Sequence, residues 1–389
     1  MPQRFRDNAE ELLVICAAEK MPQEQRQKAL ALISAGIDWT YFAETAIKGE
    51  VTALVYQALN SSNLDAAVPE KTFQRLRSRR LSIIANTSAQ HEHLCQLLRV
   101  LARENIAVLP LKGTLLSQRL YGNIDMRGAS VDIDLLIPGE DKERVKTLLP
   151  SLGYMFDPGH ELDRWQWQYT FNKARAASVE VHWDITMMVR NQSRIAGLWD
   201  GARLVADGEI SYYELKPEEL LLYLAVHLIN SSRLSQLRYV SDINTLLRKY
   251  CDRLNWDDLV EKSKNWRVSN ALYAALSLSR SLFNSNVDED AFKKLKPNLY
   301  TSALIKMFIN RKVYFRNCLR KRLINNFISY IFFELLEART GSDYLAVAKR
   351  VLFPPREVLS SCQRASSAPL PIRYIIRIFK GGCKFLVRR

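Results

Sequence analysis

The feature that most constrains the fold is an apolar stretch, residues 130–137, that contains two aspartates two positions apart. The stretch reads Ser-Val-Asp-Ile-Asp-Leu-Leu-Ile and ends at Pro138 and Gly139. In a β-strand, residues i and i+2 lie on one face with their Cα atoms roughly 6.5–7 Å apart, so Asp132 and Asp134 point together. Two carboxylates this close repel each other, which predicts that a divalent cation lies between them.

A second acidic strand is predicted at residues 178–184. Alternation puts Glu180, His182 and Asp184 on one face, and the apolar residues between them on the other. If this strand neighbours the first, Glu180 completes a metal site of three carboxylates, and His182 becomes an outer partner of the ligands or a general base. The alternative is a half-exposed edge strand with a polar outer face.

The segment Leu111-Lys112-Gly113-Thr114 is predicted to leave a strand and enter a helix. That geometry presents free backbone N–H groups and the positive end of the helix to an anion. Gly113 permits close approach, the Thr114 hydroxyl can donate, and Lys112 adds charge. The alternative is an ordinary tight turn, and the sequence has no P-loop of the G-x-x-x-x-G-K-[ST] type.

The order of elements predicts an α+β fold. Residues 105–186 have the pattern β-α-β-α-β-β-β, which indicates a small α/β unit with a mixed sheet. Helical periodicity precedes this unit and returns at 217–231, 238–250, 256–264 and 268–284, followed by a polar connection at 286–300. We therefore expect an N-terminal helical region (1–104), a catalytic core (105–190), a helical domain that shapes the substrate pocket (205–300) and a basic helical tail (301–389).

Taken together, these motifs resemble the bacterial uncharacterised nucleotidyltransferase family, a divergent branch of the DNA polymerase β-like superfamily. The resemblance covers mainly residues 105–186 and extends loosely to the segments around His227 and Asp242 and to two stretches near the end. The residues that carry it are, in order, L-K-G at 111–113, Tyr121, Arg127, D-I-D-L-L at 132–136, Gly153-Tyr154 and V-E-V-H-W at 179–183.

The resemblance implies a nucleotidyltransferase-type fold in which Asp132, Asp134 and Glu180 bind Mg²⁺, with two ions expected and Mn²⁺ as the other candidate. The same carboxylates would be the catalytic residues of an in-line displacement at the α-phosphate of an NTP. The resemblance further implies that the triphosphate is held by the turn around Gly113 and by Arg127. The turn residues assigned to this role are Lys112, Gly113 and Thr114.

The expected function is transfer of a nucleoside monophosphate from an NTP to an acceptor that the sequence does not identify. Two alternatives stay open. One is a nucleotide-binding or regulatory protein of the same fold that has lost turnover. The other is an RNA-modifying nucleotidyltransferase that uses the same site together with the basic tail. Three clustered carboxylates favour an active enzyme, because an inactive relative has no need for them.

The charge is concentrated at the end of the chain. From residue 301 to 389 there are 18 Lys and Arg against 4 Asp and Glu, so this stretch carries +14 of the formal charge of +15. The simplest interpretation is a solvated surface. Contact with nucleic acid is an alternative. A third interpretation is an interfacial helix at residues 372–389 on an anionic membrane.

The predicted location is the cytoplasm. The 6 cysteines are scattered and form no C-x-x-C pair, which argues against a zinc site or a disulfide framework. The longest apolar runs, 220–229 and 327–336, are about half the roughly 20 residues that a membrane span needs. No secretory signal is visible at the N-terminus. Nothing in the sequence indicates an oligomeric state.

Overall fold

The computed structural model of the chain describes residues 3–128, 130, 132–157, 168–174, 176–185, 192–230 and 236–308. It also describes seven single residues further on: Tyr314, Phe315, Leu336, Gly341, Tyr344, Leu345 and Lys349. Most of the predicted basic tail therefore lies outside the described residues, as does the predicted interfacial helix at 372–389. Among the described residues, no helix combines the length and the apolar character needed to cross a membrane.

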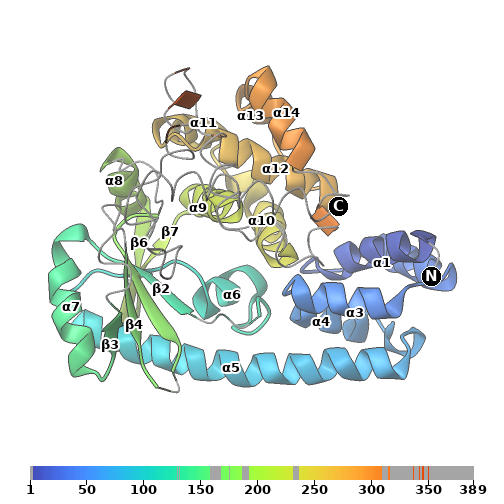
Figure 1. Cartoon of the computed structure of the whole chain (residues 1–389), viewed down its shortest axis with the longest axis horizontal. Coiled ribbons are helices and arrows are strands. Elements are labelled where there is room, and N and C mark those ends of the chain that lie inside the picture. Colours follow the sequence, from blue (N-terminus) through green and yellow to red (C-terminus); the bar gives the residue numbers. More distant parts are fainter. Residues whose placement is uncertain are drawn as a thin grey trace, which may run out of the picture.

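The first hundred residues are helical, as predicted. Four shorter helices and one 3-10 turn precede a single long helix, α5 (Glu70–Arg103), which begins directly after Pro69. Along α5, Leu76 packs in one apolar core while Leu94 and Leu98 pack in another, so one helix joins both parts of the molecule (Figure 1). The preceding elements are α1 (Gln3–Cys16), α2 (Gln23–Ser34), α3 (Trp39–Lys48), α4 (Thr52–Ser61) and η1 (Asp65–Ala67).

A mixed five-stranded sheet follows, in the element order predicted from the sequence. Its strand order is β1-β2-β5-β4-β3, with β2 and β5 parallel and the other neighbours antiparallel. The elements are β1 (Leu109–Pro110), α6 (Thr114–Tyr121), β2 (Asp132–Leu136), η2 (Gly139–Asp141), α7 (Lys142–Ser151), β3 (Met155–Asp157), β4 (Gln168–Asn172) and β5 (Ser178–His182).

The apolar alternation of β2 and β5 fixes which face of the sheet is buried. Ile133, Val179 and Val181 are at most 5% exposed and share a core with α5 and with Val145 and Leu149 of α7. Full burial of each such side chain stabilises the fold by about 1.5–3 kcal/mol. The aspartates and the glutamate of the two strands alternate with these residues and therefore lie on the opposite face.

A β-hairpin that the sequence interpretation missed follows helix α8 (Gln192–Asp200). It consists of β6 (Ala202–Asp207) and β7 (Ile210–Leu215), and the Tyr213 N–H donates to the Val108 carbonyl at 2.7 Å, beside β1. Strand β6 is mostly exposed and β7 is mostly half-exposed, so neither has the clean alternation of a strand with one buried face. The Asp207-Gly208 turn, with Gly208 at φ +58°, is the signal that could have revealed it.

The predicted helices after residue 216 are confirmed. They are α9 (Pro217–Asn230), α10 (Leu237–Tyr250), α11 (Trp256–Asn265) and α12 (Ser269–Phe283), with η4 (Cys251–Arg253) after α10. The expected connection at 286–300 is wrong in one respect: it contains α13 (Glu289–Lys294), whose first turn is capped by the Asp288 carboxylate. Helix α14 (Leu299–Phe308) follows.

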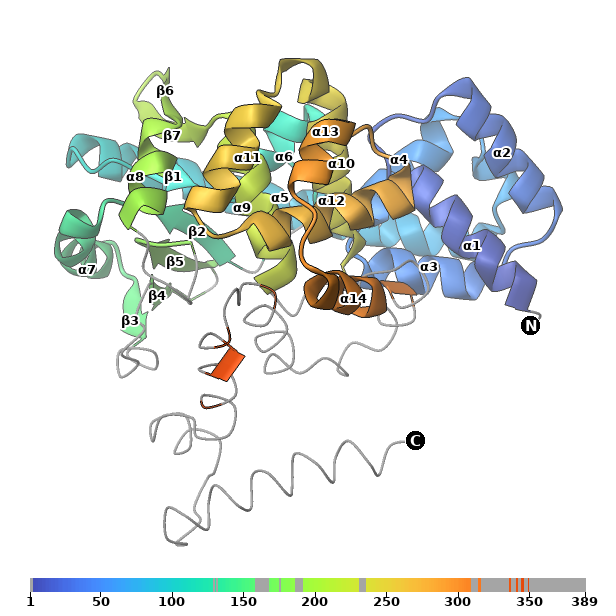
Figure 2. The same ribbon diagram turned by 90° about the horizontal axis from the view of Figure 1, so that it is seen from above.

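Helices α9–α12 lie between the sheet and the N-terminal helices (Figure 2). Leu12 and Leu13 of α1 and Leu272 of α12 are fully buried members of the same apolar core. The helices that precede the sheet in the sequence and those that follow it are thus packed together. The four-part division of the chain stays a prediction.

Candidate functional site

The two acidic strands are direct neighbours, as the sequence interpretation required for a shared site. In the parallel register Asp134 lies opposite Glu180, and Asp132 lies opposite Ser178. Since both strands bury their alternate apolar residues in one core, the carboxylates of Asp134 and Glu180 share the other face. The tertiary fold thereby joins side chains that are 46 positions apart in the sequence.

Asp134, Glu180 and His182 form a compact group whose ligand atoms all lie within 4.8 Å of one another. The His182 Nε2 is 3.3 Å from the Asp134 Oδ1 and 3.7 Å from the Glu180 Oε2. The Asp134 Oδ2 is buried and accepts no hydrogen bond from the described residues. A buried carboxylate oxygen without a hydrogen-bond partner destabilises the fold unless a cation binds it, so this donor set fits a divalent ion.

Asp132 is buried beside this group but is not part of it. Its Oδ1 accepts a hydrogen bond from the Ser130 hydroxyl at 2.5 Å, and its backbone carbonyl accepts one from the Gln90 amide at 2.8 Å. The negative charge of Asp132 nevertheless helps to raise the pKa of Glu180. Of the predicted ligand set, Asp134 and Glu180 lie together in this group, whereas Asp132 lies beside it. That all three bind one ion stays a prediction.

The charges around Asp134 are strongly coupled. Burial alone would raise the pKa of Asp134, but the Lys112 ammonium, 2.8 Å from its Oδ1, and His182 hold that pKa well below its ordinary value. Burial, with the negative charges of Asp134 and Asp132, raises the pKa of Glu180. The site therefore keeps Asp134 ionised and ready to bind a cation.

The turn at residues 111–114 adjoins the carboxylates. The Leu111 N–H donates to the Asp134 carbonyl at 3.0 Å, which fixes the turn against β2. Gly113, at φ +81°, immediately precedes α6, so the first backbone N–H groups of α6 lack helical partners. The Thr114 hydroxyl is bonded to His91 Nδ1 at 2.9 Å, a contact that the sequence interpretation did not foresee.

Arg127 has a different environment. Its Nε binds the Asp242 Oδ2 of α10 at 2.7 Å, and both side chains are almost completely buried. Tyr121 donates to the other oxygen of the same carboxylate at 2.9 Å. The guanidinium Nη2 has no hydrogen-bond partner among the described residues. Its predicted contact with a phosphate stays a prediction, while its observed contact joins the segment before β2 to helix α10.

The sequence interpretation left the role of His182 open and identified His227 as a core residue. His227 is half-buried in α9, with its ring 4.9 Å from that of Tyr239 and 5.8 Å from that of Tyr223, and it lies outside the carboxylate group. His182 is instead a member of the carboxylate group. The E-x-H spacing of β5 was the available signal, because it places both side chains on one face.

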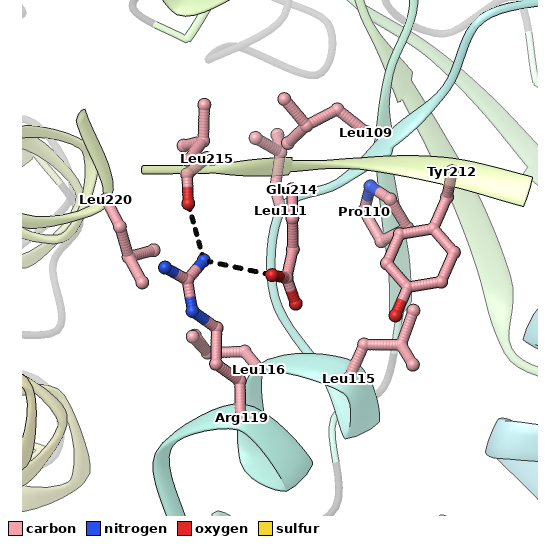
Figure 3. Close-up of a pocket in the computed structure, with 10 residues that line it drawn as sticks. All are labelled: Leu109, Pro110, Leu111, Leu115, Leu116, Arg119, Tyr212, Glu214, Leu215 and Leu220. Carbon is pink, nitrogen blue, oxygen red and sulfur yellow. Dashed lines mark hydrogen bonds and ion pairs between the residues drawn. The ribbon is translucent and has the colours of Figure 1, made fainter. Parts of the chain in front are cut away.

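A small pocket lies beside the turn at residues 111–114, on the side away from the carboxylates, and is lined mostly by leucines (Figure 3). Leu111 lines it, whereas the next residue, Lys112, reaches Asp134. Its polar lining includes Arg119, which donates to the Leu215 carbonyl at 2.6 Å and pairs with Glu214 at 3.8 Å. The pocket does not contain the carboxylates of β2 and β5, so it is separate from the candidate metal site.

Comparison with known proteins gives one match. A family model described as "Uncharacterised nucleotidyltransferase" matches residues 35–284, a range that contains the turn, both acidic strands and helices α9–α12. No curated protein matches the chain, and no solved structure matches it.

Proposed function

The chain belongs to the uncharacterised nucleotidyltransferase family, and we propose that it transfers a nucleoside monophosphate from an NTP to an acceptor hydroxyl. The observation that carries this proposal is the group formed by Asp134, Glu180 and His182, with its unsatisfied Asp134 oxygen, beside the turn before α6. Acidic ligands next to a helix N-terminus suit a substrate that brings its own phosphates and their cations.

In the proposed reaction, the acceptor oxygen forms a bond to the α-phosphorus as the bond from that phosphorus to the bridging oxygen breaks. Pyrophosphate leaves, and the Glu180 oxygen that is not bound to the cation accepts the proton of the acceptor hydroxyl. Asp134 and Glu180 would hold the divalent cation, expected as Mg²⁺ from the sequence, with Asp132 beside them. When bound, such a cation supplies charge stabilisation on the phosphate oxygens.

The turn at Lys112, Gly113 and Thr114 would hold the triphosphate. Gly113 has no neighbouring atom within 4 Å of the position that a Cβ would take, so the backbone is open to close approach. The N–H groups at the start of α6 would donate to phosphate oxygens. Lys112 would turn from Asp134 toward the phosphates once a cation neutralises that carboxylate.

The first test is calorimetric binding of NTP with and without Mg²⁺. We expect binding that depends on the metal in the natural protein and is lost in the double variant Asp132→Asn/Asp134→Asn. Glu140→Gln, which changes an exposed carboxylate after β2, is the matched control and should bind like the natural protein. Undiminished binding in the double variant, or none in either protein, would overturn the proposed site.

A nucleotide-binding protein without turnover is the second candidate, and the Lys112–Asp134 ion pair favours it. The ammonium already supplies positive charge at the carboxylate that would hold a metal. Incubation with NTP labelled at the α-phosphate, in the presence of a cell extract, separates the candidates. Transfer of label to an acceptor with release of pyrophosphate identifies the enzyme, whereas metal-dependent binding without either product identifies the binding protein.

A further inference from the structure

The third donor of the cation site is a nitrogen. We propose that His182 Nε2 is a direct ligand, so that the site takes a first-row transition ion, Mn²⁺, in preference to Mg²⁺. This inference rests on the proposed function and specifies the metal at the same site. The sequence had indicated oxygen ligands alone, from Asp132, Asp134 and Glu180.

The distances between donors support direct ligation by all three side chains. Adjacent ligands of an octahedral ion with bonds of about 2.1 Å lie about 3.0 Å apart. The His182 Nε2 is 3.3 Å from the Asp134 Oδ1 and 3.7 Å from the Glu180 Oε2, close to that separation. A small adjustment of each side chain would let all three bind one ion.

The histidine is held in position by the sheet. It ends β5, lies opposite Leu136 of β2 on one side and Gln168 of β4 on the other, and its carbonyl accepts a hydrogen bond from the Ile137 N–H at 2.9 Å. The side chain is 4% exposed. A buried residue on an inner strand has few alternative rotamers, so its donor atom is preorganised toward the carboxylates.

The chemistry of the donors decides between the metals. Mg²⁺ is a hard ion that prefers oxygen ligands and loses its water reluctantly. Imidazole nitrogen is a common ligand of first-row transition ions such as Fe, Ni, Cu and Zn, and Mn²⁺ is the member of that row that shares with Mg²⁺ the preference for carboxylates and octahedral geometry.

The test measures metal binding by the full chain without any turnover. Calorimetry with Mn²⁺ and with Mg²⁺ should show tighter Mn²⁺ binding. His182→Gln should weaken Mn²⁺ binding by at least about tenfold, the loss that removal of even an outer partner of a ligand causes, and should change Mg²⁺ binding much less. The control His93→Gln alters a histidine of α5 outside the group and should bind both ions like the natural protein.

A second readout does not depend on the folding of any variant. Pulsed electron paramagnetic resonance of the Mn²⁺ complex of the natural protein should show coupling to a ¹⁴N nucleus. Absence of that coupling, or equal affinity for both ions, would overturn the inference while leaving the proposed function in place. Failure of both ions to bind would overturn the proposed function as well.

Discussion

The guanidinium of Arg127 and the carboxylate of Asp242 form an ion pair in which the side chains are 1% and 0% exposed. Arg127 lies just before β2, and Asp242 lies on α10, so the pair connects the unit that contains the sheet to the helices that follow it. The ring of Tyr239 lies 5.5 Å from the guanidinium and covers it. A charge this deeply buried is stable only while its partner is present.

Arg127→Ala should therefore lower the free energy of unfolding by about 3–5 kcal/mol, because it leaves Asp242 buried and uncompensated. The double variant Arg127→Met/Asp242→Leu should lose much less free energy of unfolding than the two single variants lose together. Urea denaturation measures both. If Arg127→Ala instead keeps the free energy of unfolding of the natural protein but binds NTP poorly, the phosphate contact predicted from the sequence is the main role of Arg127.

Gly113→Ala should destabilise the turn by about 1–3 kcal/mol, because its φ of +81° suits glycine and strains an L-residue. Space is not the cause, since a Cβ would contact nothing there. Gly139→Ala is the matched control: it is equally uncrowded and lacks a positive φ, so its effect should stay within about 0.5 kcal/mol. NTP titration should show weaker binding for Gly113→Ala alone, and equal effects of the two changes would contradict the role of the turn.

Lys112→Met should destabilise the metal-free protein by about 3–5 kcal/mol, since Asp134 would lose its buried cationic partner. A divalent cation should then raise the melting temperature more in this variant than in the natural protein, because ammonium and metal compete for the same carboxylate. Thermal unfolding with increasing Mn²⁺ measures this difference. Lys71→Met, at an exposed position of α5, should behave like the natural protein. If Mn²⁺ raises the melting temperature of Lys112→Met and of the natural protein equally, the Lys112 ammonium and the metal do not compete for Asp134.

In the absence of nucleotide, Asp134→Asn and Asp132→Asn should differ in how strongly they weaken binding of the metal ion. Asp134 belongs to the group that fits a single ion, whereas Asp132 is bonded to Ser130. We expect Asp134→Asn to abolish binding of the ion, and Asp132→Asn to weaken it by roughly tenfold or less, comparable to loss of an outer partner. Calorimetric Mn²⁺ titration compares them. Equal losses would place both aspartates directly on the same ion.

Local patterns predicted much of the fold. The alternation of Ile133, Asp134 and Leu135 indicated both the strand and its buried face, and the order of elements through residue 186 is confirmed. Helices with long apolar periodicity, such as α9 and α12, were predicted to within one or two residues. The hairpin β6–β7 was missed because β6 is mostly exposed and β7 mostly half-exposed, and α13 because six residues are too few to establish a period.

The sequence by itself determined which side chains share a face, since a strand alternates its residues whatever surrounds it. That is why Asp132 and Asp134, or Glu180 and His182, could be paired from their spacing. Only the tertiary structure decided that β2 and β5 are parallel neighbours, with Asp134 opposite Glu180 and His182 facing both. It likewise decided that Lys112 meets Asp134 and that Arg127 meets Asp242. Contacts between distant segments depend on how apolar faces pack together, and the spacing within one segment contains no information about its partner.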